Sequence, residues 1–119
     1  MPKYLISFEK GAMDHIPGED WGEVGKAAHA VCQEAKDAGV FVFAGGLSYD
    51  DGDVEAAVVA VDGTVIDGPY PESKEVIGGV LIVDVPTREA ALEWAGKIAV
   101  ACRCAQDVRK FMFDPELVD

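Results

Sequence analysis

Two hydrophobic repeats of different period alternate along the chain, and their order constrains the fold more than any other feature. Residues 3–9 follow a period of two, with Tyr4, Ile6 and Phe8 on one side, which is typical of a β-strand. Residues 40–44 are β-branched or aromatic apart from a final alanine, and they predict a buried strand.

Between these two strands, apolar residues recur at steps of three and four, which predicts a helix. Asp20 and Glu23 form an acidic variant of the capping box at its start. Gly39 ends the helix, because glycine readily takes the left-handed conformation found there. We expect the rings of Trp21, in this helix, and Trp94, in a later one, to lie in the core between helices and sheet.

The second half of the chain adds a hairpin and then repeats the order strand, helix, strand. Strand patterns cover residues 55–61, 64–67, 79–85 and 108–113. The pair Asp62-Gly63 is typical of a two-residue hairpin turn. Thr87 is placed to cap the second helix. Residues 45–53 and 68–75 are rich in glycine, proline and acidic residues and predict loops.

This order predicts one α+β domain over residues 1–119. Without the extra strand of the hairpin it is β-α-β-β-α-β, the ferredoxin-like arrangement, with two helices on one face of an antiparallel sheet. The other face would expose apolar side chains to water in a monomer. Because large exposed apolar faces usually mark interaction surfaces, we expect a homodimer whose sheets pack face to face.

The charge and the cysteines limit the classes of function. The chain carries 22 acidic and 10 basic side chains, a net charge of −12, which disfavours nucleic acids and anionic membranes as partners. Its apolar runs are too short to span a bilayer. Residues 1–14 lack a secretory signal, and three cysteines are an odd number, so we expect a cytoplasmic protein with reduced thiols. With only two histidines and one Cys-x-Cys pair, we expect no metal site.

Residues 67–79, Asp-Gly-Pro-Tyr-Pro-Glu-Ser-Lys-Glu-Val-Ile-Gly-Gly, resemble the Asp-Gly-Pro-Phe signature of the YCII-related family in its DGPF branch, with Tyr70 in place of phenylalanine. The flanking segments 38–47, 89–95 and 107–110 are similar to that family too. The resemblance implies a dimeric α/β barrel and small bacterial proteins, mostly of unknown activity. Some relatives carry a paired histidine and aspartate, and one is a dehydrochlorinase acting on a chlorinated hydroxyhydroquinone. DGPF members often occur beside extracytoplasmic-function sigma factors.

His29 is the candidate acid–base residue. It lies in the first helix, 16 residues before Gly45, a spacing that resembles that of the histidine in the YCII dyad. A histidine titrates near neutral pH and can move protons. Asp67, at a strand end before Gly-Pro, is the best carboxylate partner, although it could instead fix the following turn. Asp50 or Asp51 would be the competing partner, and the sequence leaves the choice open.

Five further positions in the two acidic loops are candidates for ligand binding: Gly45, Gly46, Ser48, Tyr70 and Lys74. The glycines would allow a ligand to approach the backbone, and the Tyr70 hydroxyl would donate a hydrogen bond. Each position is also compatible with an ordinary solvated loop. Eight of the 22 acids fall between residues 45 and 75, which favours a neutral or cationic ligand, or an anion met by Lys74 or by protonated His29.

Two classes of function follow. The first is a lyase- or isomerase-like enzyme in which His29 moves a proton and Asp67 orients it; no cofactor is expected, because the chain has no dinucleotide or phosphate-binding glycine motif. The second is a non-catalytic dimeric module that binds a small molecule or regulates a partner such as a sigma factor.

Overall fold

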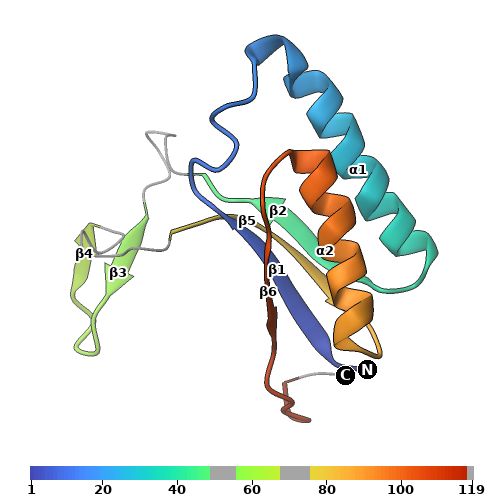
Figure 1. Cartoon of the computed structure of the whole chain (residues 1–119). Helices are drawn as coiled ribbons and strands as arrows, with labels where there is room; N and C mark the ends of the chain where they lie inside the picture. Colours follow the sequence, from blue (N-terminus) through green and yellow to red (C-terminus); the bar gives the residue numbers. More distant parts are fainter. Residues whose placement is uncertain (49–55, 68–75, 118–119) are drawn as a thin grey trace.

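The computed structural model describes residues 1–48, 56–67 and 76–117. Its elements, in chain order, are β1 (Lys3–Glu9), a 3-10 turn (Gly18–Asp20), α1 (Trp21–Asp37), β2 (Phe41–Gly46), β3 (Ala57–Val59), β4 (Val65–Asp67), β5 (Ile77–Asp84), α2 (Arg88–Cys102) and β6 (Asp107–Lys110) (Figure 1).

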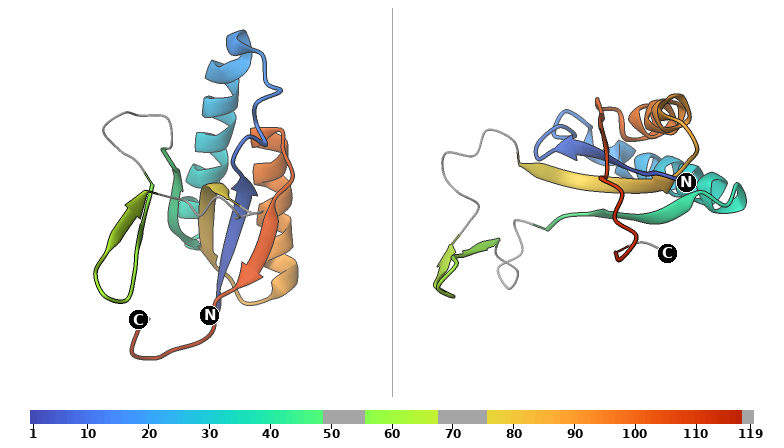
Figure 2. Two further views of the ribbon diagram at one scale, coloured as in Figure 1. Left: turned by 90° about the vertical axis from the view of Figure 1, so that its left-hand side faces the viewer. Right: turned by 90° about the horizontal axis from the view of Figure 1, so that it is seen from below.

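Four strands form one antiparallel sheet in the order β2-β5-β1-β6. Both helices lie on the same face of it (Figure 2). This is an α+β architecture compatible with the ferredoxin-like fold, as the order of the hydrophobic repeats predicts. No helix in the described ranges is long and apolar enough to cross a membrane.

The core lies between the sheet and α2. Tyr4 and Ile6 of β1 are opposite Val83 and Leu81 of β5, and all four side chains are buried on the helix side. They pack with a buried stripe of α2 formed by Ala91, Ala95, Ile98, Ala101 and Cys102. The period of two in β1 therefore reports the buried face correctly, because alternate side chains point to opposite faces of a strand.

The sequence marks three helix ends, and the structure confirms two of them, the start of α2 and the end of α1. The Thr87 Oγ1 accepts a hydrogen bond from the Ala90 N–H at 3.1 Å. At the end of α1, Gly39 has a φ of 75°, its N–H donates to the Lys36 carbonyl, and the Val40 N–H donates to the Ala35 carbonyl. These bonds are those of a Schellman motif. The end of α2 is left-handed at Arg103 instead of glycine.

The predicted capping box at the start of α1 is wrong. Asp20 has a helical backbone conformation and makes no side-chain cap. Its carboxylate accepts a hydrogen bond from the Arg103 guanidinium at 2.8 Å, and Glu23 lies 3.9 Å from the same guanidinium. A partner 83 residues away therefore takes the oxygen that the sequence pattern assigns to the helix start. Trp21 is 45% exposed, so the prediction of a core position is wrong for this ring.

The strand predicted over residues 40–44 is present but is not buried. Among the described strands, β2 lies at the edge of the sheet and pairs only with β5, and Val42 and Phe43 are 42% and 57% exposed. It also runs on through Gly45 and Gly46, which the sequence places in a loop. Hydrophobic composition alone cannot distinguish an edge strand from a central one.

The predicted hairpin is present as its own two-stranded sheet, β3-β4, and adds no strand to the main sheet. Its loop has three residues, not two. The Gly63 N–H donates to the Ala60 carbonyl, and the Ala60 N–H donates to the Thr64 carbonyl. Gly63 alone has a positive φ, 89°, whereas a two-residue type I′ turn needs two such residues.

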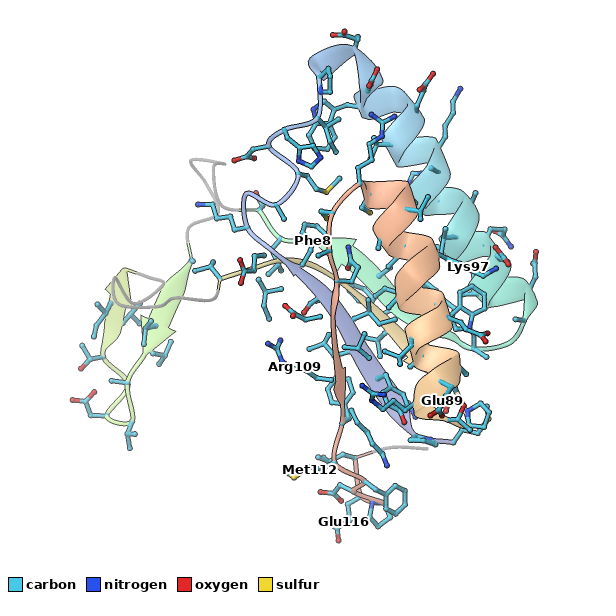
Figure 3. All side chains as sticks on the ribbon, in the orientation of Figure 1. Phe8, Glu89, Lys97, Arg109, Met112 and Glu116 are labelled. Carbon is cyan, nitrogen blue, oxygen red and sulfur yellow. The ribbon has the colours of Figure 1, made fainter. Side chains whose placement is uncertain are left out.

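The sheet face opposite the helices carries the apolar side chains that the sequence leads us to expect there. Leu5, Val80 and Ile82 are half-buried, and Phe43 is exposed beside them. Arg109 projects from β6 on this side, away from the helices (Figure 3). We call the surface of these five residues the open face.

Candidate functional site

A pocket of about 260 Å³ lies between the sheet and the two helices; we call it the His29 pocket. Its lining residues come from every layer of the main body: Phe8, Ala28, His29, Cys32, Ala44, Gly45, Gly46, Val80, Leu81, Ile98, Cys102 and Gln106. Mostly apolar walls with a few polar groups are typical of a ligand site, and the volume lies just below the roughly 300–1,000 Å³ common for drug-sized molecules. The pocket therefore suits a small ligand.

Small residues on the helix side of the sheet leave the space for this pocket. Gly46 is opposite Gly79, and Ala44 is opposite Leu81. The ring of Phe8, at the end of β1, covers Gly79 (Figure 3). A Cβ on Gly79 would lie 2.6 Å from two carbons of that ring. The Gly-Gly pair of the signature therefore seats the aromatic ring that forms one wall of the pocket.

His29 reaches the pocket from α1. Cys32 follows three residues later in the helix, so both side chains point to the same side, and both line the pocket. His29 is exposed as a whole residue, which places its ring at the mouth of the pocket rather than at its bottom. No residue within the described ranges hydrogen-bonds to its imidazole, so both ring nitrogens are available to a ligand.

The thiols of the pocket are protonated at neutral pH. Burial raises the pKa of the Cys102 thiol to about 11, and repulsion from Cys104 and Cys32 adds to this rise. Burial also raises the pKa of Cys32, although the nearby Lys36 ammonium opposes it. Because the thiolate is the reactive form, neither thiol is an activated nucleophile. Within the described part of the chain, no group of three histidine, cysteine or acidic side chains is arranged to hold a metal ion.

Of the predicted site residues, the structure brings together His29, Gly45 and Gly46. Ser48 is exposed just beyond β2, outside the pocket lining. Asp67 ends β4, opposite Ala57, in the hairpin that stands apart from the helices (Figure 1). Four further candidates lie outside the described residues: Asp50, Asp51, Tyr70 and Lys74. The pairing of Asp67 with His29 stays a prediction.

Nine of the twelve described lining residues are absent from the sequence-based set, and four of these are aromatic or carry a sulfur or amide group: Phe8, Cys32, Cys102 and Gln106. The sequence contained an indication for two of these four residues. Cys32 is three residues after His29 in the helix, and Phe8 continues the buried side of β1. Cys102 and Gln106 had none, because their places depend on where α2 ends and how the chain returns to the sheet.

A second hollow of about 320 Å³ lies between the two ends of the chain, lined by residues 1–3 and 110–113. Its described lining includes none of the predicted site residues, and the ionisable side chains in that lining are Lys3 and Lys110. The His29 pocket is therefore the better candidate for chemistry.

A comparison with protein-family models matches residues 9–105 to the YCII-related domain. No curated protein matches the chain.

Proposed function

The chain belongs to the YCII-related family, and we propose that it binds a small, mostly apolar molecule in the His29 pocket and moves a proton on that molecule. The supporting observation is that the pocket joins an unengaged imidazole to apolar walls and to the side-chain-free Gly45-Gly46 segment. Proton transfer by a positioned histidine suits lyase- or isomerase-type chemistry without a cofactor.

In this proposal, Asp67 orients the imidazole and stabilises its protonated form. Support comes from the resemblance to relatives with a histidine–aspartate pair and from the place of Asp67 at the end of β4, immediately before Gly-Pro. Asp50 and Asp51 are the competing carboxylates.

We also propose that the chain is a homodimer through the open face and belongs to the DGPF branch. The dimer is supported by four apolar side chains on a surface that no described helix covers, Leu5, Phe43, Val80 and Ile82. The branch is supported by residues 67–79, which depart from its signature only at Tyr70.

The second candidate function is a dimeric binding or regulatory module without catalysis. One observation favours it: among the residues that the structure describes, none of those lining the His29 pocket is a carboxylate. An association with a sigma factor would fit this candidate, with family resemblance as its support.

Deuterium exchange separates the two functions. Cyclohexanone is small enough for the pocket, and a general base abstracts its α-hydrogens, so exchange in D2O can be followed by proton NMR. We expect the protein to accelerate exchange and His29→Ala to lose at least about tenfold of that acceleration, since general acid–base catalysis contributes roughly 10²–10⁴-fold in an evolved site. His15→Ala is the matched control, because His15 is exposed and outside the pocket.

If cyclohexanone binds at Gly45 and Gly46 but the rate of deuterium exchange is the same in the protein and in His29→Ala, the non-catalytic module is favoured over the enzyme. The two amide resonances report binding, since both glycines line the pocket.

A further inference from the structure

Gln106 is a polar lining residue of the His29 pocket whose place follows from the start of β6. Asp107 is opposite Ser7, and Val108 is opposite Ile6. Val108 packs against the core on the helix side. Because strand side chains alternate, Gln106 also falls on the helix side, next to Phe8. Both residues line the pocket, and Gln106 is only partly buried.

The orientation of the Gln106 amide is set by its own turn. Its Nε2 donates to the Cys104 carbonyl at 3.3 Å and also contacts the Cys104 Sγ at 3.5 Å. The opposite amide orientation would set two oxygens against each other, so the bond to Cys104 fixes the nitrogen on that side. The Oε1 carbonyl therefore points away from Cys104, and no donor in the described part of the chain bonds to it.

Apart from the imidazole of His29, the described walls of the pocket carry no ionised side chain. Within residues 1–48, 56–67 and 76–117, its lining contains no aspartate, glutamate, lysine or arginine, and the raised pKa of Cys102, about 11, keeps that thiol neutral. A cation would meet no carboxylate among these residues and an anion would meet only the imidazole of His29, so a charged ligand would lose its hydration at a cost in this mostly apolar pocket. A neutral ligand with a hydrogen-bond donor would instead satisfy the unengaged Oε1.

We infer that Gln106 is a specificity-determining residue of the His29 pocket: its Oε1 accepts a hydrogen bond from a neutral hydroxyl group on a ligand with an apolar body. His29, on α1, then faces the same ligand from another wall. The inference rests on the proposed binding role of this pocket, and it adds the class of ligand: neutral alcohols rather than carboxylates or ketones.

Three probes of similar size test this preference: cyclohexanol, cyclohexanone and cyclohexanecarboxylate. Binding to the full chain is measured at pH 8 from the Gly45 and Gly46 amide shifts. We expect the alcohol to bind about fivefold more tightly than the ketone, the factor that one neutral hydrogen bond contributes. The carboxylate should bind least tightly.

Gln106→Met keeps the length of the side chain and removes the acceptor, so we expect it to abolish the preference for alcohol over ketone. Gln33→Met is the matched control, because Gln33 is exposed on α1, bonds to Asp37 and lies outside the pocket; it should keep the preference. The ratio of the two affinities is the decisive readout, since a general loss of structure would weaken both probes alike.

Three results overturn the inference: an unchanged preference in Gln106→Met, tightest binding by the carboxylate, or no shift of the pocket amides with any probe. Its failure is distinguishable from failure of the proposed catalysis. If exchange depends on His29 but Gln106→Met keeps the preference for alcohol over ketone, only the proposed role of Gln106 is wrong. If the protein prefers the alcohol but exchange does not depend on His29, only the proposed catalysis is wrong.

Discussion

Gly79→Ala is expected to destabilise the protein through a single contact, that between the new methyl group and the Phe8 ring. The new Cβ would lie 2.6 Å from Cε1 and Cζ of Phe8 and 3.3 Å from the Gly45 carbonyl oxygen. Normal carbon–carbon contacts are about 3.5–4.0 Å, so the ring must move by about an ångström. Overpacking of this kind costs about 1–3 kcal/mol.

The backbone conformation at Gly79 adds nothing to that cost, and an effect on the unfolded chain partly offsets it. Gly79 has no positive φ, so alanine adds no backbone strain. Alanine in place of glycine also restricts the unfolded chain, which stabilises by about 0.4–1 kcal/mol. We therefore expect a net loss of about 1–2 kcal/mol in the free energy of unfolding. The displaced ring should also weaken ligand binding, because Phe8 is a wall of the His29 pocket.

Urea unfolding followed by circular dichroism, at one fixed protein concentration, measures this loss. A double-mutant cycle with Phe8→Ala isolates its cause, since the methyl group has no ring to displace in the Phe8→Ala background. We expect the double variant to be more stable than the sum of the single effects by about 1–2 kcal/mol. Gly96→Ala is the matched control: its Cβ has no atom within 4 Å, and it should stabilise α2 by about 0.5–1 kcal/mol.

The reasoning is refuted if Gly79→Ala is as stable as Gly96→Ala, or if its cost persists in full without the Phe8 ring. The first result would mean that the ring moves freely. The second would place the strain elsewhere in the sheet.

Three further predictions concern the ends of α2 and the thiol beside it. Thr87→Ala removes the bond to the Ala90 N–H and should cost about 1 kcal/mol; an unchanged urea midpoint would contradict a capping role. Arg103 has a left-handed φ of 57°, so Arg103→Gly should be more stable than Arg103→Ala by about 1 kcal/mol, and equal unfolding free energies would show that the backbone is unstrained. Both variants lose the exposed ion pair with Asp20, which is worth at most about 1 kcal/mol. The pKa of Cys102 is raised from 9.0 to about 11 in the folded protein, so the unfolded chain releases this proton first and stability should fall as pH rises from 9 to about 11. Cys102→Ala should flatten that part of the pH profile, and an identical slope in both proteins would contradict the assignment.

The hydrophobic period and the residues at helix ends are sufficient to predict those elements whose boundaries are determined by neighbouring residues. The bounds of β1 agree with its period of two, the Gly39 end of α1 forms the expected motif, and Thr87 caps α2. In each case the partners are a few residues apart, so the sequence window contains all the interacting groups. The antiparallel sheet with two helices on one face follows from the order of these elements.

The mistaken predictions involve partners far apart in the sequence. Asp20 does not cap α1, because Arg103 occupies its carboxylate. The strand at residues 41–46 is exposed because it pairs with β5 alone. The hairpin loop is the exception, because the groups that make it three residues long are local: Asp62 Oδ1 accepts the Thr64 N–H at 2.9 Å. A local pattern supplies a preference, and the distant partner decides whether it is realised.

The same division applies to the candidate site. The sequence indicated His29 and the Gly45-Gly46 segment as candidates, and the acidic residues around them suggested a neutral or cationic ligand, or an anion met by Lys74 or by protonated His29. The tertiary structure placed Phe8 on Gly79, buried Cys102 and brought Gln106 into the same pocket, whose described lining has no acidic, lysine or arginine side chain. The sequence alone determined the order of strands and helices and the candidate acid–base residue, because these depend on local period and residue chemistry. Only the folded chain decided which side chains share the His29 pocket, since that depends on packing between residues up to about a hundred positions apart.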